Sequence, residues 1–401
     1  MRVLYVVPDP GVTPRARGGG FQTHVSETIR HLEALGHEVA LLDSGQLEFE
    51  ADGRPRGGRA YGWKERLPRP VRVVGRDLLY LLHNRRFGPR VAEFAARRGP
   101  FDVVYERYHA FEWAVGAWSR RARRPWVVEF NASVDELKLL GGLGLGRVGR
   151  RIERSVVRRA NQLVAVSGVL GRDLERMGVA SERIHVLHNG VDELRFRPDL
   201  DGSEVRRQLG LEGRTVVGFV GSFAAYHGVD LFLEAARRVA GARPGVTFLL
   251  VGGREGNLRY ETLRAAHAAA VEAGQVVFAG EVAHARIPAY LAAMDVAVIP
   301  MAADYGSPTK TFEYMAMGRA VVAPAVPALR EVLEDRRTAL LTRPGEVDDL
   351  VRACAELVAD AGLRRRLGEA ARAEVVARHT WAGNARAIQA VLEQAVAEGP
   401  R

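Results

Sequence analysis

A lysine and a glutamate stand three residues apart in the stretch SPTKTFEYMAMG, residues 307–318. The chain holds 58 lysines and arginines but only three lysines, so the choice of lysine at position 310 indicates a specific role. An ammonium group binds phosphate as a compact point charge, and a carboxylate accepts hydrogen bonds from hydroxyl groups. Together, Lys310 and Glu313 point to a phosphorylated ligand that carries a sugar.

A short helix is predicted to position this pair. Ser307 is a favourable N-cap, Pro308 suits the first helical position, and Gly318 suits the position just past the last turn. The helix should therefore span residues 308–317 and carry the pair on one face.

A phosphate at the start of this helix would meet unpaired N–H groups, the positive end of the helix dipole and the Lys310 ammonium. Glu313 would lie about 4.5 Å further along the axis, given a rise of about 1.5 Å per residue. This offset suits the two ribose hydroxyls of a nucleoside diphosphate. The alternative is an exposed ion pair between the two side chains, which would contribute only about 0.2–0.5 kcal/mol.

Short apolar runs rich in valine and leucine alternate with segments of helical period, which is typical of α/β proteins whose parallel strands are buried on both faces. Two series of strands can be traced. The first is expected at Val3–Val7, Glu38–Leu42, Val103–Tyr105, Trp126–Phe130, Leu163–Val166 and His185–Leu187. The second is expected at Thr215–Val220, Thr247–Val251, Val276–Phe278, Val296–Ile299, Ala320–Val322 and Ala339–Leu341.

The turn-rich, polar segment 189–202 separates the two series and predicts a hinge. We therefore assign residues 1–192 to a first Rossmann-like domain, residues 203–378 to a second, and residues 379–401 to a C-terminal helix that packs back on the first. Ligands of open α/β sheets bind at the carboxyl ends of the strands. Two such domains facing each other would place a ligand cleft between them.

Polar residues and glycines follow the strands of the first domain. Gly18-Gly19-Gly20 precede a helical pattern and would let a ligand approach the backbone closely, unless they form a turn without a ligand. His109 follows the third strand, and Glu129 lies in the fourth near its end. We take Glu129 and His109 as candidate catalytic residues; the alternatives are a structural ion pair of Glu129 with an arginine, and a structural role for His109.

Small residues follow two strands of the second domain. Gly221 and Ser222 follow one strand, and Gly253 lies before Arg254 at the end of the next. Bulky side chains at these strand ends would block a flat or phosphorylated ligand. We therefore place Ser222, Gly253 and Arg254 among the candidate binding residues.

The net charge of +10 and the pI near 10.1 favour anionic partners such as nucleotides and phospholipid surfaces. The basic segment 147–159 carries Ile152, Val156 and Val157 on one side, and it is the candidate for peripheral contact with a membrane. The alternative is a helix whose apolar side packs on the core. Cys354, the single cysteine, excludes an intrachain disulfide and indicates a reducing compartment.

Three further classes of protein are not favoured. The sequence shows neither zinc-ligand spacing nor aromatic residues interleaved with basic ones, so a nucleic-acid-binding module is not expected. No run approaches 18 consecutive apolar residues, so a membrane-spanning protein is not expected. The N-terminal apolar run is too short for a signal peptide, so a secreted protein is not expected either.

Taken together, the motifs resemble the retaining glycosyltransferases of family 4, which have two facing Rossmann-like domains in the arrangement called GT-B. The resemblance covers most of the chain and rests on the segments SPTKTFEYMAMGRAVVAP (307–324), RVLYVV…GGGFQTHV…LGHEV (2–39), VAVSGVLGRDLERMGV…IHVLHNGVD (164–192), VVGFVGSFAAYHGVDLFLEA (216–235), VTFLLVGG (246–253), VVFAGEV (276–282) and AYLAAMDVAVIP (289–300).

The resemblance implies that Glu313 binds the ribose of a nucleotide-sugar donor. It also implies that Lys310 and the helix start hold the donor's diphosphate, and that Gly19 and Gly20 adjoin the transferred sugar. Backbone contacts to the base are implied for the loop after Phe278. The helix start comprises Ser307, Pro308 and Thr309.

The sequence departs from the family pattern at two places. Many members carry a glutamate eight residues before the ribose-binding one, and here that position holds Tyr305. The role of that acid near the sugar is therefore vacant, or it passes to Asp304 or to the backbone of Tyr305–Ser307. Many members also carry an arginine and a lysine where this chain has Ser222-Phe223 and His227-Gly228. Two usual cations are thus absent, and Lys310, together with Arg254, would carry more of the diphosphate binding.

We therefore expect a retaining hexosyltransferase, of EC class 2.4, that moves a hexose from a UDP- or GDP-linked sugar to a hydroxyl of a glycan, lipid or secondary metabolite. The donor is a co-substrate, and we expect no further cofactor, no metal ion and no nucleic-acid partner. A cytoplasmic location is expected, with peripheral contact at the inner face of the membrane. The alternatives are a nucleotide-sugar epimerase of the same fold and a catalytically silent nucleotide-binding homologue.

Overall fold

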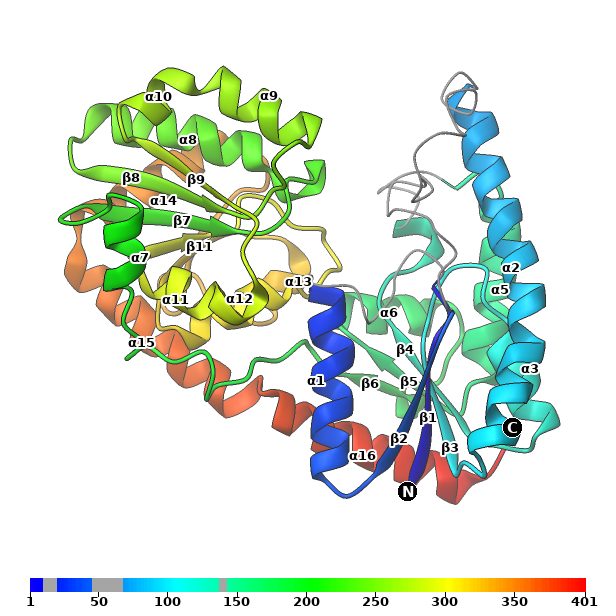
Figure 1. Ribbon diagram of the computed structural model, residues 1–401. Helices are drawn as coiled ribbons and strands as arrows, with labels where there is room; N and C mark the ends of the chain where they lie inside the picture. Colours follow the sequence, from blue (N-terminus) through cyan, green and yellow to red (C-terminus); the bar gives the residue numbers. More distant parts are fainter. Residues whose placement is uncertain (10–19, 45–67, 137–142) are drawn as a thin grey trace. The chain divides into compact units, whose positions relative to one another are not determined.

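The structure is a computed structural model, and it describes residues 1–9, 20–44, 68–136 and 143–401. The chain divides into two compact units, whose elements are labelled in Figure 1. Unit 1 holds the first strand, Phe21–His188 and Asn384–Arg401, whereas unit 2 holds Gly20 and Asn189–Gly383. The prediction of a cleft concerns the arrangement of the two units and stays a prediction.

Unit 1 is built on a parallel six-stranded sheet of order β2-β1-β3-β4-β5-β6. The order reverses between β1 and β3, so the carboxyl ends of these two strands flank a switch point, where open α/β sheets bind ligands. Its strands are β1 (Arg2–Val7), β2 (Glu38–Asp43), β3 (Val103–Arg107), β4 (Trp126–Phe130), β5 (Gln162–Ala165) and β6 (Ile184–Val186).

Helices cover this sheet. The described helices of unit 1 are α1 (Gly20–Ala34), α2 (Arg69–Arg98), α3 (Ala114–Arg121), α5 (Gly146–Arg159), α6 (Gly168–Arg176) and most of α16 (Trp381–Glu398). Apolar residues of α16, among them Ile388 and Leu392, pack with Val3 and Tyr5 of β1 in one hydrophobic core. The last helix of the chain thus completes the core of the unit that the first strand begins.

Unit 2 contains a second parallel six-stranded sheet, of order β12-β11-β10-β7-β8-β9. Its switch point lies between β7 and β10. The strands are β7 (Thr215–Val220), β8 (Val246–Val251), β9 (Val276–Gly280), β10 (Val296–Val298), β11 (Ala320–Pro324) and β12 (Leu340–Thr342).

The described helices of unit 2 form two apolar cores with its sheet. They are α7 (Ser203–Gln208), α8 (Val229–Ala242), α9 (Leu258–Ala266), α10 (Ala268–Glu272), α11 (Ile287–Ala292), α12 (Thr309–Ala316), α13 (Pro327–Arg330), α14 (Val347–Ala359) and α15 (Ala361–Arg378).

The predicted strands are confirmed, with ends that differ by no more than about two residues. All five residues of β4 are buried, as expected for a strand covered on both faces. For segment 147–159, the alternative of a helix whose apolar side packs on the core is the one observed. In α5, Val156 and Val157 are buried and Ile152 packs on a small core, so the apolar side of this helix belongs to the protein interior.

Buried carboxyl groups lie under the carboxyl ends of β3 and β4. Glu106 accepts a hydrogen bond from the Trp126 indole at 2.9 Å, and Glu112 accepts one from the Val115 N–H at 2.9 Å. Glu153 accepts one from the Val134 N–H at 2.7 Å. Burial raises the pKa of Glu153 to about 8, although the Val134 N–H opposes this shift.

This raised pKa predicts a stability that depends on pH. Because folded Glu153 keeps its proton up to about pH 8, while an ordinary glutamate loses it near pH 4.5, its contribution is present below pH 4.5 and is lost as the pH rises through 8. Glu153→Gln keeps the shape but cannot ionise. In urea unfolding between pH 5 and 9, the free energy of unfolding of the wild type should fall as the pH rises. The slope of this fall should correspond to about one proton more in the wild type than in Glu153→Gln. Equal slopes in the two proteins, or the same effect from Glu175→Gln at an exposed position, would contradict this assignment.

Candidate functional site

Helix α12 is held against the end of β7 at the switch point of unit 2. The Tyr314 hydroxyl accepts a hydrogen bond from the Val220 N–H at 2.8 Å, and Phe312 and Met315 are buried in the core below. Burial, offset in part by the Val220 contact, raises the pKa of Tyr314, so its hydroxyl stays neutral. The first turn of α12 is thereby fixed beside the carboxyl end of a central strand.

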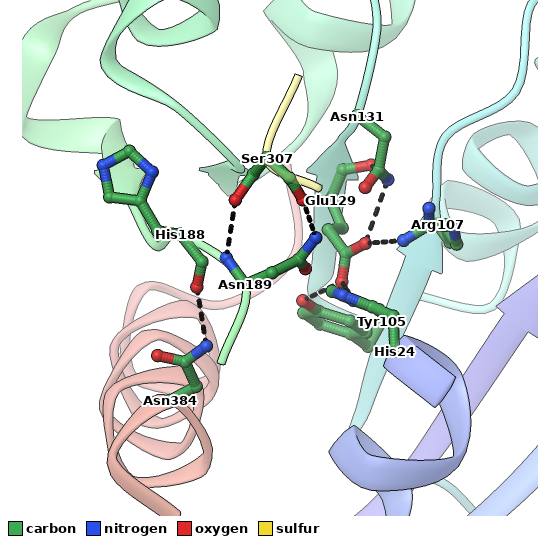
Figure 2. A network of polar contacts seen from close by, with 9 residues as sticks. All are labelled: His24, Tyr105, Arg107, Glu129, Asn131, His188, Asn189, Ser307 and Asn384. Atoms are coloured by element: carbon green, nitrogen blue, oxygen red, sulfur yellow. Dashed lines mark hydrogen bonds and ion pairs between the residues drawn. The ribbon is translucent and has the colours of Figure 1, made fainter. Parts of the chain in front are cut away.

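The predicted helix ends where expected, because Gly318 has a φ of 60° that suits glycine just past the last turn. Its start is corrected. The capping position is occupied by Pro308, which gives no side-chain cap, rather than by Ser307. Ser307 instead accepts hydrogen bonds from Asn189, whose N–H lies 3.0 Å from the Ser307 Oγ and whose amide contacts the Ser307 carbonyl (Figure 2). The first N–H groups of α12 therefore receive no cap from a side chain.

Lys310 reaches from the first turn of α12 over the end of β7. Its Nζ lies 4.5 Å from the centre of the Phe219 ring, and a Cβ atom on Gly221 would lie 2.5 Å from this Nζ. Glycine at position 221 is therefore needed for the ammonium to occupy this place. Burial lowers the pKa of Lys310 to about 8, which Glu313 opposes, so the ammonium remains mostly protonated at pH 7.

His227 lies beside the same strand end. Its Nδ1 is 2.7 Å from the Ser222 carbonyl oxygen, so this nitrogen donates and the opposite nitrogen, Nε2, does not take part in that bond. Burial, followed by the positive charge of Lys310, lowers the pKa of His227 to about 4. The imidazole is therefore neutral at pH 7, and of these two side chains only Lys310 carries a positive charge.

Glu313 is 7% exposed, and the ion pairs among the described residues do not join it to Lys310, so the alternative of an exposed pair is excluded. Its Oε1 lies 3.7 Å from Nε2 of His284. The Arg195 guanidinium donates to Nδ1 of His284 at 2.9 Å, which places the imidazole proton on Nε2, toward Glu313. The Glu313 carboxylate therefore lies beside His284, and among the described residues no lysine or arginine forms an ion pair with it.

Three further predicted residues lie at the ends of neighbouring strands. Half-buried Phe278 contacts the rings of Phe223 and Tyr260, with ring centres 6.1 and 5.7 Å away. Gly253 adjoins the same ring cluster, since a Cβ there would lie 2.7 Å from Tyr260, whereas Arg254 is exposed. The structure thus brings Ser222, Lys310 and Gly221 together, and it places Gly253 and Phe278 around an adjacent aromatic cluster.

Two residues were candidates for the position of the missing family glutamate. Tyr305 is buried and Asp304 is exposed, and the Asp304 carbonyl accepts a hydrogen bond from Ala328 at 2.9 Å. Pro308 and Thr309 are half-buried at the start of α12. Among the residues that the structure describes, no group of three or more His, Cys, Asp or Glu side chains is arranged to hold a metal ion.

In unit 1, the Glu129 carboxylate is surrounded by four donors at the carboxyl ends of β3 and β4 (Figure 2). His24 Nε2 and the Tyr105 hydroxyl each donate to Oε2 at 2.8 Å. Arg107 donates to Oε1 at 2.5 Å and Asn131 at 2.9 Å. Burial alone would raise the pKa of Glu129, but His24 and Arg107 outweigh it and hold this pKa well below its usual range.

This geometry revises the role expected for Glu129. The side chain is 1% exposed, and both of its oxygens already accept two hydrogen bonds. A carboxylate in this state neither reaches a substrate nor takes up a proton near pH 7. The structural ion pair with an arginine, the alternative raised by the sequence, is the one observed, and Glu129 acts as a positioning residue for His24 and Arg107.

His109 keeps a more accessible position. Its Nε2 lies 3.5 Å from Asp9, its ring packs edge-on against Tyr80, and its side chain is partly exposed. Gly20 forms the start of α1 and is exposed, whereas Gly19 lies outside the described residues. His109 is thus the predicted catalytic residue of unit 1 that remains open to a ligand.

Some residues of the two sites were missed by sequence reasoning. Tyr314 holds α12, and His284 with Arg195 adjoins Glu313 from 29 and 118 positions away in the chain. No local spacing connects them, because the contacts form only when the hinge segment, the turn after β9 and α12 are brought together.

The fold and the two sites define a protein of the GT-B type, with two Rossmann-like units that each carry polar residues at the switch point of a parallel sheet. Residues 18–195 match the family model Glycosyltransferase Family 4, and residues 214–360 match the model Glycosyl transferases group 1. The chain belongs to this glycosyltransferase family, and it is therefore an enzyme of the glycosyl-transferring class.

Similar proteins support this assignment over nearly the whole chain. A D-inositol 3-phosphate glycosyltransferase of Acidothermus cellulolyticus is 29% identical over 95% of this chain and 86% of that protein. A GDP-mannose-dependent alpha-mannosyltransferase of Mycolicibacterium smegmatis is 29% identical over 90% of each. The structure of Anabaena HepE in complex with UDP has the same fold, with a TM-score of 0.70 and 20% identity. The match covers 98% of this chain and 100% of that one. These relatives give no support to the epimerase alternative.

The network around Glu129 predicts a large loss of stability on its neutralisation. Glu129→Gln would leave the partly buried Arg107 without its counter-charge, which should lower the free energy of unfolding by about 3 kcal/mol. The matched control is Glu38→Gln, which breaks the exposed pair with Arg2 and should cost far less. Chemical unfolding measures both. Wild-type stability combined with lost turnover in Glu129→Gln would restore a catalytic role for this residue.

Proposed function

We propose that this glycosyltransferase moves a hexose from a nucleoside-diphosphate sugar to an acceptor hydroxyl with retention of configuration at the anomeric carbon. The observation that carries the proposal is the start of α12, where uncapped N–H groups and the Lys310 ammonium lie beside Gly221 at the switch point of unit 2. Unpaired N–H groups, the positive helix end and an ammonium together favour a diphosphate.

The donor fits this site in a defined order. The diphosphate would contact the start of α12 and Lys310, and the ribose hydroxyls would donate to Glu313 one turn further along the helix. The turn after β9 and the Phe278 ring cluster would adjoin the base. A GDP-linked donor is named for one relative and UDP is bound to one structural neighbour, so both bases are candidates.

The chemistry depends on the leaving diphosphate. Negative charge develops on it in the transition state, and fixed N–H groups with Lys310 stabilise this charge without reorganisation. Because the leaving phosphate and the entering hydroxyl share one face of the sugar, the phosphate itself can accept the proton of the acceptor. We assign no protein nucleophile, no metal ion and no cofactor beyond the donor.

Unit 1 is assigned to the acceptor. Its accessible candidate is His109, which Asp9 orients, while Glu129 holds the neighbouring side chains in place. The acceptor class stays a glycan, lipid or secondary metabolite. A cytoplasmic protein in peripheral contact with a membrane is proposed, and the described residues include no helix long and apolar enough to cross a bilayer.

A panel of donors tests this function. Thermal unfolding with UDP-, GDP-, ADP- and dTDP-sugars identifies the base, since a ligand at 100 times its Kd stabilises the folded state by about 2.7 kcal/mol. Donor hydrolysis or transfer is then followed by release of the nucleoside diphosphate, with EDTA and with added manganese. Binding without any turnover would indicate a silent homologue, and turnover that requires the metal would refute the metal-free mechanism.

Substitutions at the two residues of α12 should separate binding from rate. Lys310→Arg should lower turnover at least tenfold, because the guanidinium is wider and competes with the N–H groups for the same oxygens. Glu313→Gln should weaken donor binding at least tenfold, because hydrogen bonds to a charged group are worth roughly 1.5–3 kcal/mol. Glu272→Gln, on the exposed surface of the same unit, is the control. Wild-type kinetics in both variants would show that the donor does not bind at this site.

A further prediction concerns His227, which is neutral at pH 7 beside the proposed diphosphate. His227→Lys would add a cation there, and we expect donor binding to tighten about tenfold, or by about 1.4 kcal/mol. His227→Gln should bind like the wild type at pH 7, since both side chains are uncharged. Calorimetric titration with the nucleoside diphosphate gives the Kd values. Weaker binding by His227→Lys would mean that this histidine faces another part of the ligand.

A further inference from the structure

Helix α2 carries an apolar face that the protein interior does not use. Val71, Leu78, Leu79 and Leu82 are 51%, 48%, 44% and 54% exposed. Every other described helix carries at most one large hydrophobic side chain with this degree of exposure. These four exposed apolar side chains are gathered on one helix, whereas single exposed apolar side chains are common on soluble proteins.

The apolar face points directly away from the core. At about 100° per residue, the four side chains occupy a sector of roughly 100° on the helix. The residues of α2 that are most deeply buried, Asp77, Asn84, Phe87 and Val91, lie on the opposite side. The outward face of a surface helix is normally polar. In the N-terminal half of α2 this face is apolar instead, which indicates that a partner covers it.

Positive charge borders this face. Arg72, Arg85 and Arg86 are exposed, and the ion pairs among the described residues give none of them a carboxylate partner. Between residues 70 and 92 the only acidic residue is Asp77, which is fully buried and pairs with Arg76. The occupant of this face must therefore combine an apolar layer with negative charge.

We propose that the exposed face of α2, formed by Val71, Leu78, Leu79 and Leu82 with Arg72, Arg85 and Arg86, docks the protein on a membrane surface rich in anionic phospholipids. An amphipathic helix lying in the membrane interface inserts leucine side chains below the headgroups while arginines contact the phosphates. A second copy of this chain fits less well, because a two-fold contact would bring the same arginines together.

The surface differs from the one that the sequence indicated. In α5, Val148 is the single large apolar side chain with substantial exposure, and Val156 and Val157 are interior. The assignment of α2 rests on the proposed membrane contact but not on the donor chemistry, which unit 2 carries. Failure of the two proposals can therefore be told apart by separate measurements.

The test is co-sedimentation of the full chain with phosphatidylcholine vesicles that contain or lack phosphatidylglycerol. The wild type should bind the anionic vesicles at least tenfold more tightly, and added salt should weaken this binding. Leu78→Glu with Leu82→Glu, and separately Arg85→Glu with Arg86→Glu, should each reduce it at least tenfold. Leu258→Glu, at a leucine that is 83% exposed on α9, is the matched control and should bind like the wild type.

Each other outcome overturns a defined part of the proposal. Equal binding to neutral and anionic vesicles, or none, rejects an anionic membrane as the occupant. Tight binding that survives both α2 variants rejects this surface. A dimer that dissociates only in Leu78→Glu with Leu82→Glu, seen by sedimentation velocity, replaces the membrane with a second copy. Unchanged melting temperature and donor binding in all variants confirm that the fold and the donor site are intact.

Discussion

The structure depends on strands that are buried on both faces. An unpaired charged group is costly on either face of such a sheet, so polar side chains collect near the strand ends, where they can pair with one another. Both units follow this constraint. Glu129, Arg107 and Asn131 gather at the ends of β3 and β4 in unit 1, and Gly221, Ser222 and Lys310 gather at the end of β7 in unit 2. The two switch points are thus the natural places for ligands.

The two units use these ends in different ways. In unit 1 the charges satisfy one another, since Glu129 accepts hydrogen bonds from His24, Tyr105, Arg107 and Asn131. In unit 2 the charges remain separated. Lys310 makes no ion pair with Glu313, and the neutral His227 adds no second cation. Among the described residues Lys310 makes no ion pair, and an ammonium beside uncapped N–H groups is the arrangement that favours an anion.

The two basic helices of unit 1 show how far a local pattern determines the use of a surface. Both α2 and α5 combine arginines with aliphatic residues, and the charge pattern of α5 made it the stronger candidate for a membrane surface. The direction of an apolar side depends on what packs against the helix. In α5, Val156 and Val157 are buried and Ile152 packs on the small core that contains Val134, whereas Leu78 and Leu82 of α2 stay about half exposed.

The sequence by itself determined the strands, the two parallel sheets and the helix that carries Lys310 and Glu313, because these features follow from local hydrophobic period and turn residues. It also provided the family, through motifs spread along the chain. The tertiary structure decided which polar groups are free. The role of Glu129 changed because its four partners come from segments up to 105 positions away, and the place of Glu313 depends on His284 and Arg195 in the same way. Burial and long-range hydrogen bonds set the charge state and reach of a side chain, and neither is encoded in local spacing.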